Sequence, residues 1–240
     1  MTEPRASRIW AISDLHLSFA QPDLGDRTQY AGRWKDHVAQ IEAQWREVVG
    51  RDDVVLIPGD FSMARNHREI QPDLRWLERL PGIKVLSPGN HDRWFNQIDR
   101  VRPLLRPSQR AVDGDAIATP AAIICGARSA ETPPTDALSP VAATALKRLE
   151  QSLQHAQTLQ TENPAPIVVL WHYPPFDRHG RPGPWVEVLE RFGAAACVYG
   201  HLHGASQWRT APQGVIRGVR YACVAADAVG FRPLRVSVGD

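Results

Sequence analysis

Short apolar runs recur along this 240-residue chain, and within each run the apolar residues do not alternate with polar ones. An unbroken run of this length is typical of a strand that is buried on both faces, beneath helices or a second sheet. The runs predict strands at or around residues 9–12, 54–57, 83–86, 121–125, 167–171, 195–199, 221–225 and 234–238.

Amphipathic segments between several of these runs predict helices. In residues 34–49 the apolar positions recur at spacings of four and three, which places them on one stripe of a helix. Further helices are predicted at residues 73–80, from Ser139 and Pro140 onwards, and at 185–192. Because strands and helices alternate in the first half, we predict an α/β fold with residues 1–240 as one domain. The stretches 102–120 and 128–138 are predicted to be loops.

Composition and charge narrow the class of protein. Hydrophobic residues make up 43% and charged residues 22%, as in ordinary globular proteins. The net charge is +2 and the arginines are scattered, so nucleic acid is not an expected partner. No apolar stretch approaches the ~20 residues of a membrane span, and the N-terminus lacks the apolar core of a signal peptide. We therefore expect a cytoplasmic protein, with Cys125, Cys197 and Cys223 reduced in its core.

Polar side chains that can bind metal ions follow five of the predicted strands. They are Asp14 and His16, then Asp60, then Asn90, His91 and Asp92, then His172, and finally His201 and His203. The carboxyl ends of parallel strands meet at one edge of a sheet, where α/β folds build their sites. Any one of these clusters alone is ordinary turn chemistry. Five of them in order, each directly after an apolar run, indicate a shared site.

The types of ligand indicate which metals could bind. Carboxylate, imidazole and amide oxygen without thiolate suit Mn, Fe, Zn or Mg. The candidate ligands are Asp14, His16, Asp60, Asn90, His172, His201 and His203, too many for one ion and suitable for two that share Asp60. Two ions roughly 3.5–4 Å apart can hold a hydroxide between them and clamp a phosphoryl group for attack.

The motifs SDLHL, PGD, GNHD, WH and GHLH resemble the five signature blocks of the calcineurin-like metallophosphoesterases, and they span residues 13 to 203. The resemblance implies two mixed β-sheets packed as a sandwich, with helices on the outer faces and a dinuclear metal centre at the sheet edge. It assigns Asp14, His16 and His203 to the first metal, Asn90, His172 and His201 to the second, and Asp60 to both. It makes His91 the acid or phosphate-stabilising residue and Asp92 the partner that holds the His91 ring.

The resemblance implies a metal-dependent phosphohydrolase that acts on a small phosphorylated substrate, a monoester or a diester. A hydroxide bridging two divalent ions, with Mn favoured, would attack phosphorus while His91 assists the leaving group. A cyclic nucleotide phosphodiesterase, a nuclease and a non-catalytic metal-binding scaffold remain alternatives. No pattern indicates the oligomeric state.

The loops around the site should select the substrate. They are predicted at residues 19–30, 65–68, 93–94 and 173–181. Within them Trp94, Tyr173 and Phe176 are candidates to stack on a base or an apolar leaving group, but packing is the stronger expectation, since aromatic residues near a sheet edge are usually buried. The second block continues as Phe-Ser-Met-Ala, without the further Asn or acidic residue that many family members have there. His37, His67 and His155 are expected to be exposed.

Overall fold

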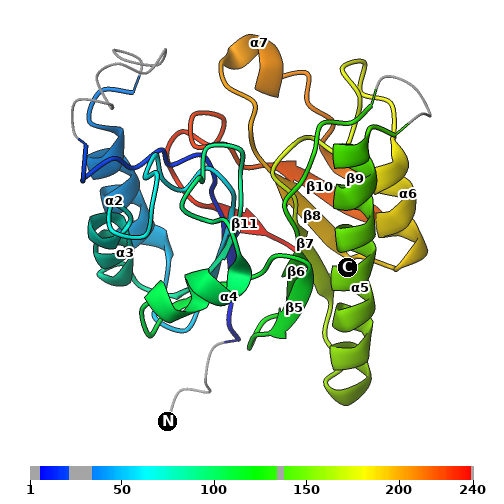
Figure 1. Ribbon diagram of the computed structural model, residues 1–240, viewed down its shortest axis with the longest axis horizontal. Coiled ribbons are helices and arrows are strands. Elements are labelled where there is room, and N and C mark those ends of the chain that lie inside the picture. The colour runs from blue at the N-terminus through cyan, green and yellow to red at the C-terminus, as the bar shows by residue number, and fades with distance from the viewer. Residues whose placement is uncertain (1–5, 22–33, 134–137, 239–240) are drawn as a thin grey trace.

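Two mixed β-sheets pack face to face, and helices cover their outer faces (Figure 1). The computed structural model describes residues 6–21, 34–133 and 138–238. The architecture is the α/β sandwich that the resemblance implies. The N-terminal residues 1–5, residues 22–30 of the first substrate loop and residues 134–137 of the segment 128–138 lie outside the described residues.

The first sheet has the strand order β11-β1-β2-β3-β4. Its members are β1 (Ile9–Ala11), β2 (Val54–Pro58), β3 (Ile83–Ser87), β4 (Gln109–Ala111) and β11 (Leu234–Val236). Strands β1 to β4 run parallel, and β11 pairs with β1 in the antiparallel direction.

The second sheet has the strand order β5-β6-β7-β8-β10-β9. Its members are β5 (Asp115–Ala118), β6 (Ile123–Gly126), β7 (Ile167–Leu170), β8 (Ala196–Tyr199), β9 (Gly214–Ile216) and β10 (Val219–Cys223). Strands β6, β7, β8 and β10 are parallel, while β5 and β9 form antiparallel edges.

The unbroken apolar runs follow from this sandwich. In β2, Val54 and Leu56 enter the core between the sheets, whereas Val55 and Ile57 face the helices. Strand β7 does the same, since Val168 joins the inter-sheet core. Successive side chains point to opposite faces of a strand, and here both faces are covered, so neither set can be polar.

Helices α2 (His37–Val48) and α3 (Gln71–Glu78) pack on the first sheet, and α5 (Pro140–Glu162) and α6 (Pro184–Arg191) on the second (Figure 1). Ser139 caps α5 by accepting a hydrogen bond from the N–H of Ala142 at 3.2 Å. The short helices α4 (Ile98–Val101), η1 (Arg102–Leu104) and α7 (Ala205–Trp208) complete the helical elements of the described residues. None of these helices combines the length and apolarity needed to cross a membrane.

The predicted loop at residues 102–120 was wrong, because it contains η1, β4 and β5. Strands β4 and β5 are three and four residues long and lie at sheet edges. Each therefore buries few apolar side chains, and the sequence shows no unbroken apolar run at either strand. His37 and His67 also differ from expectation, because both are half-buried. The Nε2 of His37 lies 3.0 Å from the carbonyl of Leu15.

Candidate metal centre

The loops that follow β1, β2, β3, β7 and β8 meet at one edge of the sandwich and bring the seven predicted metal ligands together. The backbone of the first two loops stays paired beyond the strands, since the N–H groups of Asp14 and His16 donate to the carbonyls of Gly59 and Asp60 at 3.1 and 3.0 Å. The chain after β1 also reaches the second sheet, because Ser13 donates its N–H to the carbonyl of Val224 at 2.8 Å. The two sheets therefore join at the site.

The backbone at this edge is strained. Seven described residues other than glycine have a positive φ, and four of them are the predicted ligands Asp14, His16, Asp60 and His201, with φ of 58°, 44°, 50° and 68°. Residues with side chains seldom occupy this region, and such outliers cluster at functional sites. Their concentration here supports a functional role for this edge of the sandwich.

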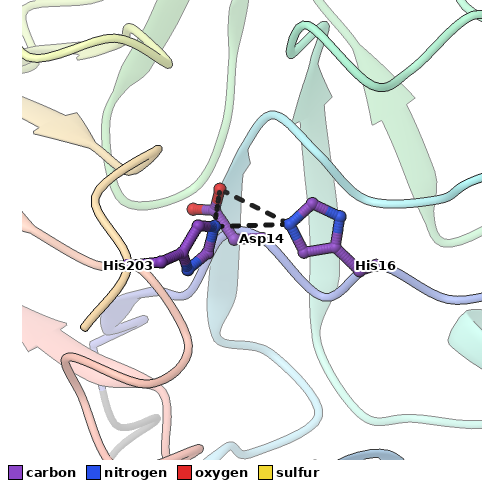
Figure 2. A group of neighbouring side chains, drawn as sticks. All are labelled: Asp14, His16 and His203. Atoms are coloured by element: carbon purple, nitrogen blue, oxygen red, sulfur yellow. Dashed lines mark hydrogen bonds and ion pairs between the residues drawn. The ribbon is translucent and has the colours of Figure 1, made fainter. Parts of the chain in front are cut away.

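Asp14, His16 and His203 form a first group, in which one ligand atom from each residue lies within 4.8 Å of the others (Figure 2). Nε2 of His203 lies 3.4 Å from Oδ1 of Asp14 and 3.4 Å from Nε2 of His16. Figure 2 shows one nitrogen of each ring turned towards the same carboxylate oxygen. Two imidazole nitrogens and a carboxylate oxygen at this spacing suit a divalent cation.

Asp60, His172 and His201 form a second group that meets the same distance limit. Oδ1 of Asn90 adds a fourth ligand, 2.8 Å from Nε2 of His172 and 3.0 Å from Nδ1 of His201. Oδ2 of Asp60 lies 3.3 Å from Nε2 of His172 and 4.0 Å from Nε2 of His16. Asp60 therefore faces a histidine of each group, as a shared ligand must.

Hydrogen bonds fix which ring nitrogen two of the histidines offer. Nδ1 of His172 lies 3.0 Å from the carbonyl of Pro58, so it carries the proton and leaves Nε2 to face Asp60. Nδ1 of His203 lies 3.2 Å from Oδ1 of Asp227, and its Nε2 faces Asp14. A second partner that fixes the tautomer is the usual companion of a metal-binding histidine.

Asp227 is not among the site residues that the sequence predicts. This residue lies after β10, and its second carboxylate oxygen accepts the N–H of Gly204 at 2.8 Å. The pattern that identified the other residues also applies to Asp227, because it directly follows the apolar residues 221–226. A single carboxylate after the last strands of an unassigned sheet gave no reason to place it beside His203.

The negative charges of the carboxylates and the positive charges of the histidines at this site stabilise one another. Burial would raise the pKa of Asp60, but His172, His16 and the N–H of His91 outweigh it and hold the pKa below the usual value. Burial would lower the pKa of His172, but Asp60 and Asp14 raise it to about 9. Burial lowers the pKa of His201 to about 4, so its ring is neutral and able to bind metal at neutral pH.

Glycines let the loops approach the two carboxylates. A Cβ atom on Gly89 would lie 2.2 Å from Oδ1 of Asp60, and one on Gly200 would lie 2.1 Å from Oδ2 of Asp14. Neither of these glycines has a positive φ, unlike Gly59 at 89°. Glycine is therefore needed at position 59 for its backbone conformation, whereas Gly89 and Gly200 serve close packing.

His91 and Asp92 take different places. The ring of His91 is exposed, with its centroid 5.3 Å from that of His16, and its N–H donates to Oδ1 of Asp60 at 2.8 Å. Asp92 is 1% exposed, and among the described residues no hydrogen bond joins its carboxylate to the His91 ring, so the expected role in orienting that ring stays a prediction. Its carboxylate accepts hydrogen bonds from the N–H groups of Phe61, Ser62 and Gly89 and from Nε1 of Trp94. Asp92 holds the Asp60 and Asn90 loops together.

The predicted substrate loops contribute unequally to the surroundings of the centre. Trp94 and Phe176 are buried in the core as expected, but Tyr173 is half-buried with its ring 4.2 Å from that of His201. Arg65 pairs with Glu69 at 3.1 Å, and Arg93 is exposed. Of Trp94, Tyr173 and Phe176, it is thus Tyr173 whose ring adjoins the centre.

Comparison with known proteins gives a family match over most of the chain. The family model of the calcineurin-like phosphoesterases matches residues 7–205. The Gene 66 proteins of Mycobacterium phages D29 and L5 are 39% and 37% identical over 87 and 86 residues, which is 36% of this chain in both cases. The match covers 41% and 40% of the phage proteins, so it spans about two-fifths of their length.

Two solved structures resemble this one at low sequence identity. The protein of unknown function AQ665 from Aquifex aeolicus is 15% identical, with a TM-score of 0.48 over 95% of both chains. The phosphopantetheinyl hydrolase PptH from Mycobacterium tuberculosis is 16% identical, with a TM-score of 0.48 over 96% of both chains.

Proposed function

This chain belongs to the calcineurin-like phosphoesterases, and from that premise we propose that it is a metal-dependent hydrolase of phosphate mono- or diesters. The observation that carries the proposal is the placement of Asp60 between two groups of ligand atoms. A single ion would need only one of those groups. On this proposal the substrate of the enzyme is a small phosphorylated molecule.

The donor atoms suit two divalent cations. Asp14, His16 and His203 would hold one ion, Asn90, His172 and His201 the other, and Asp60 both. The ligands are oxygen and imidazole nitrogen, which favours Mn, Fe, Zn or Mg, with Mn as the first candidate. A bound pair of this kind supplies Lewis acidity and a hydroxide nucleophile at neutral pH.

His91 acts on the substrate in this proposal. Its exposed ring adjoins His16, and its backbone N–H is tied to the shared carboxylate of Asp60. The ring can therefore reach a phosphoryl group held between the two metal positions. There it donates a proton to the departing oxygen or a hydrogen bond to the phosphoryl oxygens.

The test compares His91→Ala with the native protein on two monoesters in the presence of Mn²⁺. Phenyl phosphate releases a basic oxygen that needs a proton, whereas p-nitrophenyl phosphate releases an anion that is stable without one. If His91 is the acid, turnover of phenyl phosphate falls about 10²–10⁴-fold and that of p-nitrophenyl phosphate much less. Equal losses assign His91 to stabilising the phosphoryl group.

The control variant is His155→Ala, which removes an exposed histidine on α5. Both variants should keep the Mn²⁺ content of the native protein, because neither residue is among the proposed ligands. If the native protein hydrolyses no phosphate ester with any of the four metals, the proposed activity is wrong.

A further inference from the structure

A pocket of about 380 Å³ opens beside the second ligand group. His201 and Tyr173 line it, and Glu131, Phe176, Arg178 and Ser206 are among its other residues. Its volume is within the range of small-molecule sites. An inorganic phosphate or the phosphoryl group of a monoester at the metal positions would leave this space empty.

The lining combines a flat apolar surface with open hydrogen-bonding groups. The ring of Tyr173 packs against that of His201. The ring of Phe176 packs against that of Tyr221, with their centroids 4.8 Å apart. Among the described residues, neither Glu131 nor Ser206 has a hydrogen-bond partner for its side chain, and Arg178 bonds only His179 through Nε. A carboxylate, a hydroxyl and a guanidinium beside aromatic rings suit a planar ring that has both donors and acceptors at its edge.

The position of the pocket indicates which part of a substrate it receives. His91 adjoins His16 of the first group, whereas the pocket adjoins His201 of the second. If His91 protonates the departing oxygen, the leaving group lies beside His91, on the side of the first ligand group. The group in the pocket is then an ester substituent that stays on phosphorus, and a monoester has no such substituent.

We propose that the pocket beside Tyr173 and His201 binds the retained nucleoside-type group of a phosphodiester. This inference rests on the proposed function. In the reaction a water oxygen forms a bond to phosphorus and the bond from phosphorus to the leaving oxygen breaks. One proton of that water is released and the leaving oxygen gains one. The product that stays in the pocket is a nucleoside monophosphate.

The experiment uses three esters that release the same p-nitrophenolate in the presence of Mn²⁺. They are p-nitrophenyl phosphate, methyl p-nitrophenyl phosphate and thymidine 5′-(p-nitrophenyl phosphate). The native protein should have a kcat/KM for the thymidine ester at least tenfold above that for the methyl ester. Tyr173→Ala should lower the ratio of the thymidine-ester value to the methyl-ester value about tenfold, the loss of a ring stack, whatever it does to both esters through His201.

Tyr173→Phe separates the ring from its hydroxyl, and it should keep most of the preference for the thymidine ester. Val141→Ala, an exposed position on α5, serves as the remote control. Thymidine itself provides a readout without turnover. It should give saturation-transfer signals in the NMR spectrum of the native protein, and these should weaken in Tyr173→Ala.

The outcomes distinguish this inference from the proposed function. Hydrolysis of all three esters at similar kcat/KM, with no effect of Tyr173→Ala on the ratio of the two diester values, overturns the pocket assignment and leaves the hydrolase intact. A preference for p-nitrophenyl phosphate over both diesters also overturns it. Hydrolysis of none of the esters overturns the proposed function itself.

Discussion

Oδ1 of Asp227 lies 3.2 Å from Nδ1 of His203, and this contact turns the other ring nitrogen of His203 towards Asp14. The two residues come from loops after different strands, β10 and β8, which are neighbours in the second sheet. A carboxylate in this position fixes the tautomer of a metal-binding histidine and raises its basicity. Asp227 therefore supports His203, one of the proposed ligands of the first metal, without belonging to that ligand group itself.

Replacing Asp227 should weaken metal binding. We expect Asp227→Ala to lower the affinity for Mn²⁺ about 10–100-fold, because His203 loses the acceptor that orients it. Equilibrium dialysis against Mn²⁺ measures the effect, and Asp52→Ala, an exposed carboxylate, is the matched control. An unchanged affinity in Asp227→Ala would show that His203 needs no such support.

Asp92 should contribute to the stability of the folded protein. Its carboxylate accepts four hydrogen bonds in a buried position, and Asp92→Asn turns an N–H₂ group towards some of those donors. We expect the free energy of unfolding in urea to fall by about 2–3 kcal/mol. If Asp92 instead orients the His91 ring, stability should hold and only turnover should fall.

The packing of Gly89 against Asp60 gives a steric prediction. In Gly89→Ala the new Cβ would meet Oδ1 and the backbone N of Asp60 at 2.2 and 2.3 Å, so the carboxylate of Asp60 must move. We expect this variant to lose Mn²⁺ binding. Gly214→Ala has open space around its Cβ and should cost only about 1–2 kcal/mol for its positive φ, with full Mn²⁺ content. Equal Mn²⁺ content in both variants would contradict the prediction.

Asp73 should make stability depend on pH. Burial raises the pKa of this carboxyl, which accepts hydrogen bonds from Ser62 and Phe19, from 3.8 to about 6. Between these values the folded protein binds the proton and the unfolded chain does not, so this group lowers stability as pH rises from about 4 to 6. The asparagine in Asp73→Asn cannot ionise, so the variant does not lose this stability as pH rises.

The measurement for Asp73 is the difference in unfolding free energy between Asp73→Asn and the native protein. This difference should shift in favour of the variant by about 2 kcal/mol between pH 4 and pH 7. Taking the difference removes the opposite contributions of carboxyls such as Asp60, which both proteins share. A difference that is constant with pH would mean that Asp73 titrates normally in the folded protein.

The sequence predicts the parts of this fold that bury apolar surface on both faces. Runs such as residues 54–57 and 167–171 mark central strands because helices and the other sheet exclude polar residues there. Strands β4, β5 and β9 lie at or beside sheet edges, where that demand is relaxed, and no run marks them. The family resemblance, rather than the runs, predicted that the strands divide into two sheets.

The site shows a similar boundary between what sequence can and cannot predict. Residues such as Asp14 and His172 follow buried strands directly, so topology alone gathers them at one edge. The partners of Asp92 and the pairing of Asp227 with His203 depend on how loops from distant parts of the chain pack, which no local pattern encodes. The role of Gly89 in admitting Asp60 also becomes visible only when the two loops are seen together.

The most direct test of the account is a titration of the metal-free protein with Mn²⁺, followed by electron paramagnetic resonance. We predict two Mn²⁺ ions per chain with the spectrum of an exchange-coupled pair, because Asp60 is placed to bridge them, and loss of that coupling in Asp60→Ala. Binding of a single ion, or of two ions with uncoupled spectra, would contradict the shared centre on which the proposed hydrolase rests.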